Sequence, residues 1–211
     1  MMLKKSSILE RVKRWKALTW NEGELTLFKM KIFLGAAALD LYKNRLIELN
    51  NSKKRARSIL YQLGCFQGKE AFKIISRLYG FSKRITDKSK MLDLQISQTE
   101  LTGHGTFKFT RKDFKNKIFV VHGNSTYARI YKEKIGLSKE VEDNQMRGVF
   151  TKFVESIIKE PCFGIETKCI AKGDSYCEFV IKTIDKWDKD DPIVKKQTPI
   201  KLKADDFKIH N

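Results

Sequence analysis

The sequence predicts an α+β domain in which an antiparallel sheet of about four strands is covered by helices on one face. Two observations predict this class. Long segments with helical spacing of apolar residues occupy the first half of the chain, and short segments with alternating apolar and polar residues follow from the middle onward. At 211 residues, of which 41% are apolar, the chain is large enough to bury its own core.

The chain begins with a basic helix and a hairpin. A capping-box pattern at residues 7–10 starts a short helix, whose apolar face includes Val12 and Trp15. Residues 19–28 predict a β-hairpin, because residues 21–24 supply a turn that contains a glycine.

Two longer helices are expected next. Residues 33–50 form a helix with a wide apolar face, and a pair of asparagines ends it. Residues 52–79 predict a second helix, which contains Gly64 and Gly68. An interior glycine costs about 1 kcal/mol relative to alanine. These two glycines therefore indicate either close packing against another element or a break in the helix.

Strands and helices are interleaved in the rest of the chain. The predicted strands are residues 91–97, 106–110, 117–122, 163–170 and 177–183, and the predicted helices are residues 125–134 and 141–159. We divide the chain into a basic helix with the start of the hairpin (1–21), a ligand-binding domain (22–184) and a charged C-terminal extension (185–211). We expect the extension to lie outside the core.

The formal net charge of +18 is the unusual feature of the composition. Residues 1–16 carry six Lys or Arg against one Glu, and residues 51–90 carry eleven against two acids. Such an excess favours anionic partners. Solvated lysine-rich faces explain it better, however, because no recognised nucleic-acid motif accompanies the charge. Nucleic acid is therefore an alternative partner that the sequence does not favour.

The cellular compartment bears on the four cysteines. The N-terminus does not resemble a secretory signal, and no stretch has the apolar length of a membrane span. We therefore expect a cytoplasmic protein, in which clustered cysteines hold metal more often than they form disulfides. Cys162, Cys169 and Cys177 are clustered in this way.

Residues 166–179 carry the most informative chemistry. Glu166, Cys169 and Cys177 offer a carboxylate and two thiols, which are zinc ligands. If an odd-length loop is centred on Gly173, the two cysteines pair across the strands with Cβ atoms about 5 Å apart. A two-residue loop would place them on opposite faces. The alternative is that the cysteines are free and pack like small hydrophobic residues.

With these residues placed, the chain resembles the 4-vinyl reductase domain family. Within that family it is similar to the N-terminal sensor domains of bacterial enhancer-binding activators that respond to aromatic compounds. The resemblance rests on residues 22–34, 58–68 and 124–129 and, most specifically, on the hairpin at 166–179. It spans roughly residues 22–182. The family shares its fold with core subunits of the TRAPP vesicle-tethering complex.

The resemblance implies a structural zinc held by Glu166, Cys169 and Cys177 together with a fourth ligand. The family's fourth position is a cysteine, and here Asp143 stands in its place. Cys162 is a nearby substitute, and a weaker site or none is the third alternative. With four protein ligands no position remains for water or substrate, so we expect the zinc to have no catalytic role.

The resemblance also implies a small apolar ligand pocket between the helices and the sheet. A histidine and a tryptophan hold the phenol hydroxyl in the phenol sensors, whereas Lys90 and His122 stand at those places here. A lysine and a histidine suit an acidic headgroup better than a phenol, and we expect a small apolar or weakly acidic ligand. The candidate lining residues are Leu60, Phe66, Phe72, Lys90, Phe109, Val120, His122 and Phe150. The alternative is that the phenylalanines simply fill the core.

We expect a stand-alone small-molecule sensor with a regulatory role and without enzymatic activity. The sequence has no Walker motif, nucleophile elbow or HExxH, and Gly103-His-Gly105 lacks the rest of a dinucleotide-binding fingerprint. The alternatives are a protein-interaction or tethering scaffold of TRAPP-like fold and a basic nucleic-acid-associated protein. We also expect a homodimer, because the N-terminal segment carries more apolar surface than a short extension can bury on itself. That surface comprises Trp15, Trp20, Leu25, Leu27 and Phe28.

Overall fold

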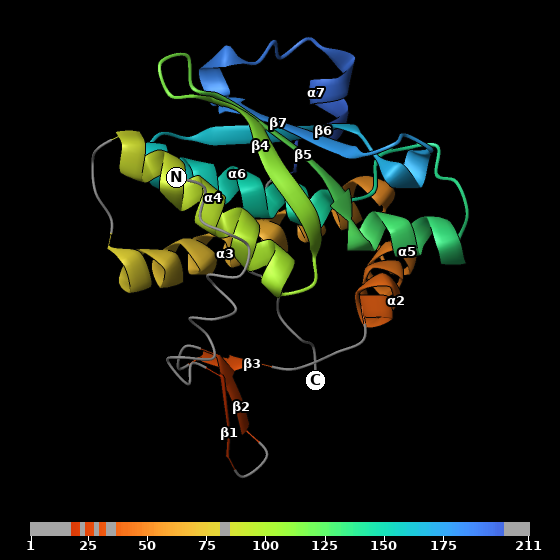
Figure 1. Ribbon diagram of the computed structural model, residues 1–211. Coiled ribbons are helices and arrows are strands. Elements are labelled where there is room, and N and C mark those ends of the chain that lie inside the picture. The colour runs from red at the N-terminus through yellow and green to blue at the C-terminus, as the bar shows by residue number, and fades with distance from the viewer. Residues whose placement is uncertain (1–17, 22–23, 28–29, 33–36, 81–84, 201–211) are drawn as a thin grey trace.

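A four-stranded antiparallel sheet is the frame on which the candidate site is built (Figure 1). The structure is a computed structural model, and it describes residues 18–21, 24–27, 30–32, 37–80 and 85–200. The strands are β4 (Gly105–Asp113), β5 (Ile118–Ser125), β6 (Cys162–Lys168) and β7 (Cys177–Thr183). Their order in the sheet is β4-β5-β7-β6, so β6 forms one edge.

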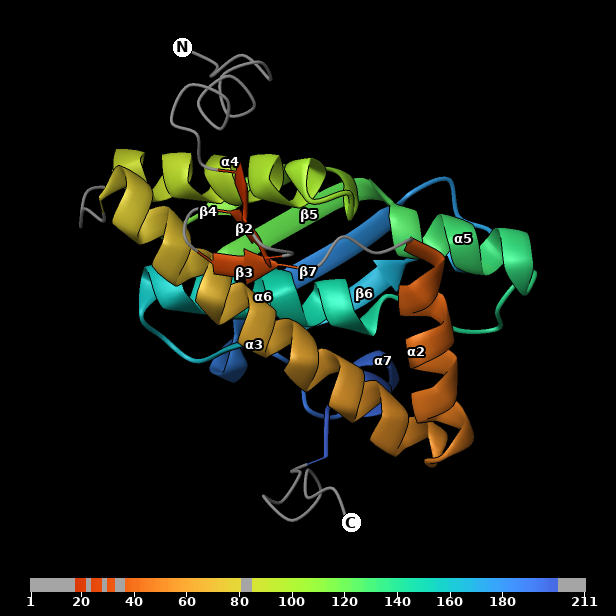
Figure 2. The same ribbon diagram turned by 90° about the horizontal axis from the view of Figure 1, so that it is seen from below.

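Helices cover one face of this sheet, as the sequence predicts. They are α2 (Ala37–Leu49), α3 (Lys53–Tyr79), α4 (Ile85–Leu101), α5 (Thr126–Lys134) and α6 (Asn144–Ile158). α6 lies between the sheet and α3, and α4 lies beside β4 (Figures 1 and 2). The predicted α+β class with an antiparallel sheet is confirmed.

The core lies between the sheet and α6. The ring of Phe150 on α6 lies 5.1 Å from the ring of Phe107 and 5.4 Å from that of Phe179, measured between centroids. Large side chains without any exposed surface surround this cluster, among them Phe119, Phe153, Phe179, Leu92, Ile157 and Ile181. Aromatic residues from the helix and from the sheet therefore fill the space between them.

Glycines bring the backbones of α3 and α6 into contact. A Cβ on Gly64 would lie 1.9 Å from the carbonyl oxygen of Gln145, and a Cβ on Gly148 would lie 2.1 Å from that of Tyr61. Real Cβ atoms essentially never come within 3.0 Å of such atoms, so the helices meet only because side chains are absent. Of the two interpretations of Gly64 and Gly68, close packing is correct, since α3 continues unbroken through both.

Residues 91–97 are helical, and the strand predicted there is wrong. They lie inside α4, where Met91, Gln95 and Thr99 are buried. This spacing of four residues is the helical period. The short run of Leu92, Asp93 and Leu94 alternates between apolar and polar as a strand does, whereas the spacing of the buried residues over the longer segment is that of a helix.

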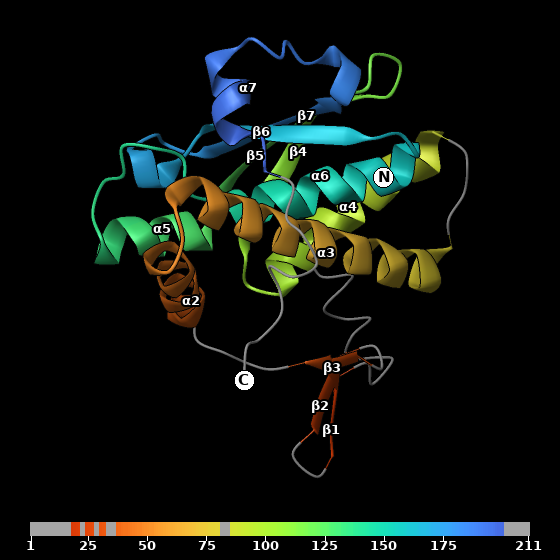
Figure 3. The ribbon, with the colours of Figure 1, turned by 180° about the vertical axis from the view of Figure 1, so that it is seen from behind.

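The predicted N-terminal hairpin is present and has a third strand. β1 (Leu18–Asn21) pairs with β2 (Glu24–Leu27), and β2 pairs with β3 (Met30–Ile32), all antiparallel. This small sheet lies apart from the four-stranded sheet (Figure 3). The basic helix predicted from residue 7 onward lies outside the described residues.

Residues 184–200, which we call the strap, pack against the outer face of the sheet. We expected this segment to lie outside the core, and that expectation is wrong for its described part. It contains η2 (Ile184–Lys186) and α7 (Pro192–Gln197), and α7 lies on the side of the sheet opposite to α6 (Figures 1 and 3). Val194 is buried beside Phe163, and the indole N–H of Trp187 donates to the carbonyl of Phe163 at 2.9 Å. These contacts of Val194 and Trp187 tie the strap to β6.

Candidate functional site

The β6–β7 hairpin brings Glu166, Cys169 and Cys177 together. The atoms that these side chains offer to a metal all lie within 4.8 Å of one another. Glu166 is 1% exposed, and both cysteines have no exposed surface. A buried carboxylate and two buried thiols at this separation could hold a metal ion.

An irregularity in β6 places Glu166 and Cys169 on the same face. Side chains three positions apart on a regular strand point to opposite faces. The register between β6 and β7 shifts by one residue between Glu166 and Lys168, which makes Thr167 an extra residue in β6. Thr167 and Lys168 are partly exposed as a result, whereas Glu166 and Cys169 are both buried.

The turn that follows places Cys177 opposite Cys169. Lys168 pairs with Glu178, so Cys169, which follows Lys168, lies opposite Cys177, which precedes Glu178. The turn contains η1 (Ile170–Lys172) and Gly173, whose φ of 104° favours glycine. The backbone N–H of Ile170 donates to the Sγ atom of Cys177 at 3.4 Å. Of the two loop alternatives that the sequence left open, the structure has the odd-length loop centred on Gly173.

The electrostatics of the group fit a cation. One carboxylate oxygen of Glu166 accepts the backbone N–H of Asp143 at 3.0 Å, and its other oxygen has no partner among the described residues. Burial and the neighbouring Cys169 raise the pKa of Glu166 well above its ordinary value. A hydrogen bond with Cys177, together with burial, raises the pKa of Cys169. An unpaired buried carboxylate oxygen is costly, and coordination of a cation shared with the two sulfurs would remove that cost.

Neither candidate for the fourth ligand joins the group. The carboxylate of Asp143 accepts hydrogen bonds from the hydroxyl of Ser125 and, at 3.2 Å, from the backbone N–H of Met146. It thereby caps α6, and burial raises its pKa to about 6. Cys162 pairs with Thr183 at the opposite end of the β6–β7 ladder, about 20 Å along the strand from Cys169. The structure therefore excludes Cys162.

The strap holds Glu166 from the outer edge of the sheet. The side-chain carbonyl of Gln197 accepts the N–H of Glu166 at 2.9 Å, and its amide donates to the carbonyl of Glu166 at 2.8 Å. The buried guanidinium of Arg147 donates to the backbone carbonyls of Gln197 at 2.8 Å and Gly164 at 3.1 Å. These bonds satisfy backbone N–H and carbonyl groups of β6 that would be unpaired at the edge of the sheet. No local pattern in the sequence around Gln197 signals this contact.

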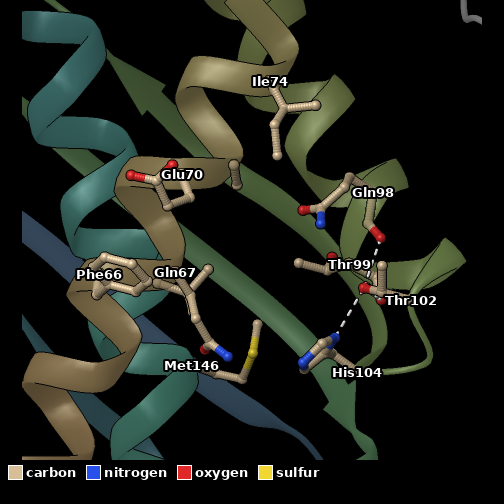
Figure 4. A pocket seen from close by; sticks show the side chains of 11 residues that line it. Phe66, Gln67, Glu70, Ile74, Gln98, Thr99, Thr102, His104 and Met146 are labelled. Carbon is tan, nitrogen blue, oxygen red and sulfur yellow. Dashed lines mark hydrogen bonds between the residues drawn. The ribbon is translucent and has the colours of Figure 1, made fainter. Parts of the chain in front are cut away.

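A pocket of about 280 Å³ lies between α3, α4 and α6. Its apolar lining includes Phe66, Ala71, Ile74, Met146 and Val149. Polar side chains gather on the α4 side and just beyond it, as Figure 4 shows for Gln98, Thr99, Thr102 and His104. Gln67 and Glu70 of α3 also line the pocket, so polar groups face it from both α3 and α4, and the α6 side is apolar.

His104 is the titratable group at one end of the pocket. Its Nδ1 atom lies 2.9 Å from the hydroxyl of Thr102. Burial lowers the pKa of His104 below its ordinary value, so the imidazole is neutral at pH 7. In the sequence, His104 drew notice only as part of an incomplete glycine motif, and its place in the pocket was not predicted.

Of the eight residues predicted to line a ligand pocket, Phe66 lines this one. Leu60 and Phe150 are fully buried, and Phe72 and Phe109 pack against the core between the sheet and α6. For Phe150, Phe72 and Phe109 the structure follows the alternative interpretation, in which phenylalanines fill the core.

Val120, His122 and Lys90 lie away from the pocket, which corrects their assignment. Val120 alternates with the buried Phe119 and Val121, so its side chain points to the outer face of the sheet. The Nε2 atom of His122 lies 2.6 Å from the carboxylate of Glu178 on that outer face. The side chain of Lys90 is 71% exposed.

Comparison with known proteins agrees with this description. Residues 144–183, which run from α6 through β7, match the family model of the 4-vinyl reductase domain. The matched segment contains the Glu166, Cys169 and Cys177 group, so the resemblance stated from the sequence is confirmed. No curated protein matches the chain.

Among solved structures, the fold is shared with the phenol-responsive sensory domain of the transcription activator PoxR, crystallised with phenol. The two are 15% identical, the match covers 95% of this chain and 100% of that one, and the TM-score is 0.72. A vinyl-4-reductase family protein from Methanocaldococcus jannaschii is 16% identical, with 88% and 98% covered and a TM-score of 0.47. A trafficking protein particle complex subunit 3 from Naegleria fowleri, covalently bound to palmitic acid, is 14% identical, with 69% and 93% covered and a TM-score of 0.46. Of the helices that the structure describes, none has the length and apolar character to cross a bilayer.

Proposed function

We propose that this chain is a regulatory module that binds a small organic molecule in the pocket between α3, α4 and α6. The observation that carries the proposal is the pocket itself, which holds about 280 Å³. A pocket that combines apolar side chains with several polar groups is typical of small-molecule sites. The fold that the chain shares with the PoxR sensory domain supports the proposal, because that domain was crystallised with phenol.

Thermal unfolding tests the proposal. A ligand at 100 times its Kd adds about 2.7 kcal/mol to the free energy of unfolding, so binding raises the Tm further as the ligand concentration increases. Ile74→Trp places a large side chain into the pocket and should abolish the shift. Ile193→Trp, at a half-exposed position on the strap, is the matched control and should retain it. A broad screen of small aromatic and aliphatic compounds that leaves the wild-type Tm unchanged would contradict the proposal.

We further propose that Glu166, Cys169 and Cys177 hold a zinc ion that stabilises the hairpin, with the described residues supplying three of its four ligands. Thiolate sulfur and carboxylate oxygen are suitable zinc ligands, and the three side chains are close enough to share one ion. When bound, the ion would join the end of β6 to the start of β7. Glu166 also accepts the N–H of Asp143, so the same ion would support the start of α6.

Elemental analysis of protein purified without chelators should find about one zinc per chain. Cys177→Ser should lose the metal, whereas Cys162→Ser, which changes a buried cysteine outside the group, should retain it. Metal-free protein in which both hairpin thiols react freely would rule the zinc out.

A second candidate function is that of an interaction scaffold, and a stripe on α2 favours it. Leu39, Tyr42, Leu46 and Leu49 recur at alternating spacings of three and four residues and are 60% to 74% exposed. This is the spacing of a coiled-coil seam, which a second copy of the chain could cover. Sedimentation velocity should show a dimer that Leu46→Glu dissociates. Leu137→Glu, at an equally exposed position elsewhere, should leave the dimer intact. A wild-type chain that sediments as a monomer at micromolar concentration would argue against this function.

A further inference from the structure

Two large aliphatic side chains are exposed on the loop that follows α5. Ile135 is 49% exposed and Leu137 is 68% exposed, and the glycine between them has a φ of 102°. A Cβ added to Gly136 would meet no atom within 4 Å other than those of its two neighbours in the chain. A single exposed leucine is common on a protein surface, whereas two aliphatic residues on one uncovered loop are typical of an interaction site.

The turn of the β6–β7 hairpin holds this loop in place. The backbone N–H of Ser138 donates to the carbonyl of Ala171 at 2.8 Å. A Cβ on Gly173 would lie 3.6 Å from the Cδ2 atom of Leu137, which is ordinary van der Waals contact. The loop after α5 and the hairpin turn therefore form one surface at the same end of the molecule (Figures 1 and 3).

Exposed cations surround the two aliphatic residues. Residues 129–139 and 170–176, which we call the tip, carry five Lys or Arg against two acids. Glu133 forms an ion pair with Lys134 at 2.7 Å, and the carboxylate of Asp174 accepts a backbone N–H at 2.8 Å, so both acids already have partners within the protein. The exposed cations of the tip are Arg129, Lys132, Lys134, Lys139 and Lys172.

This combination fits an anionic membrane surface better than other partners. At such a surface aliphatic side chains enter the boundary between headgroups and acyl chains, while nearby lysines attract anionic lipids. Nucleic acid offers phosphates but no apolar medium for Ile135 and Leu137. A second copy of the chain would bring the same cations against the tip, and its formal charge of +18 makes that contact repulsive.

We propose that the tip binds the protein to membranes that contain anionic phospholipids. Ile135 and Leu137 enter the boundary between headgroups and acyl chains, and the cations of the tip bind the anionic headgroups. No residue of the tip lines the pocket between α3, α4 and α6. The inference therefore goes beyond the proposed function and does not depend on it.

Sedimentation of the whole chain with lipid vesicles at physiological salt tests the proposal. The vesicles contain phosphatidylcholine alone or with about one third phosphatidylserine, and the wild type should bind the anionic vesicles about 100-fold more tightly. Leu137→Ser should bind them about tenfold more weakly than the wild type, because it withdraws one leucine from the acyl boundary. The pair Lys139→Glu and Lys172→Glu should weaken binding by about 25-fold or more, since each lysine near the surface contributes about fivefold.

Matched variants separate the tip from the general positive charge. Lys108→Glu with Lys115→Glu makes the same change of charge at exposed positions of β4 and the loop after it, and it should bind within about threefold of the wild type. Ile193→Ser, at a half-exposed position of the strap, is the control for Leu137→Ser. Leu137→Trp should keep the affinity, and its fluorescence emission should shift to shorter wavelength on anionic vesicles, because tryptophan favours the bilayer interface.

Several results would overturn the proposal. The wild type could bind neither kind of vesicle or both equally, or the control pair of lysines could lose as much affinity as the tip pair. Leu137→Ser with an unchanged Tm and undiminished vesicle binding would show that the aliphatic residues do not enter the bilayer. Binding of a single-stranded oligonucleotide of about 20 bases that only the tip pair weakens, without binding of vesicles, would assign the tip to nucleic acid instead. A ligand-dependent shift of Tm that persists in Leu137→Ser would show that the pocket functions whether or not the tip binds membranes.

Discussion

Replacing Gly148 by alanine should push α3 and α6 apart. The new Cβ would lie 2.1 Å from the carbonyl oxygen of Tyr61 and 2.9 Å from the backbone nitrogen of Cys65. Both obstacles are backbone atoms inside a continuous helix, so no change of side-chain rotamer can relieve the clash. The helices must separate until the distance to Tyr61 reaches at least 3.0 Å.

The cost can be estimated from this separation. A gap of about 0.5–1 Å forfeits about a quarter to a half of the dispersion energy of the contacts across it. Overpacking of a core costs about 1–3 kcal/mol, and a backbone obstacle places Gly148→Ala near the upper end of that range. The better helix propensity of alanine returns about 1 kcal/mol. The net loss is therefore about 2 kcal/mol, which corresponds to a fall in Tm of about 4–8 °C for a domain of this size.

Thermal and urea unfolding followed by circular dichroism measure this loss. Ser156→Ala, at a partly exposed position of the same helix, is the control and should change the Tm by about 1 °C or less. The double variant with Gly64→Ala should lose less than the sum of the two single losses, because one separation of the helices relieves both clashes. A Tm of Gly148→Ala equal to that of the control would refute the reasoning.

Three further predictions concern the strap, the histidine and the metal. Gln197→Leu removes both hydrogen bonds to the backbone of Glu166 and should lower the free energy of unfolding by about 2 kcal/mol, as urea unfolding would show. Because the edge of β6 is then uncovered, light scattering should show increased aggregation. An unchanged free energy of unfolding would contradict this prediction. Burial places the folded-state pKa of His104 below its value in the unfolded chain. The stability it contributes is therefore complete above pH about 6.5 and is lost as the pH falls through the folded-state pKa. His104→Asn should lack this part of the pH dependence in urea unfolding between pH 5 and 8, and an unchanged profile would count against it. Removing the metal with a chelator should weaken ligand binding in calorimetry, and equal affinities before and after would argue against coupling.

The sequence was most informative where its signals are local. The number of residues between Cys169 and Cys177 is odd, so a loop centred on Gly173 places the two cysteines opposite each other. The structure has this register. The paired glycines of α3 indicated either close packing or a break in the helix, and the structure has the close packing. In both cases the constraint lies within a few residues of the position it affects.

Other features depend on contacts that no local pattern encodes. Regular strand alternation would put Glu166 and Cys169 on opposite faces of the sheet. The extra residue Thr167 reverses this, and no sequence pattern predicts that a bulge occurs there. The strap looks like a solvated tail until Gln197 is seen beside β6.

The coupling expected between metal and ligand follows from the position of α6. Its first turn is anchored to Glu166 through the N–H of Asp143 at 3.0 Å, and Met146 and Val149 line the pocket within the next two turns. Glycine contacts pack α6 closely against α3 between these points. A change at the hairpin that releases Asp143 would shift Met146 and Val149 relative to α4. The proposed metal group, the glycine contacts and the pocket all involve α6, so we expect a perturbation of any of them to be measurable as a change in ligand affinity.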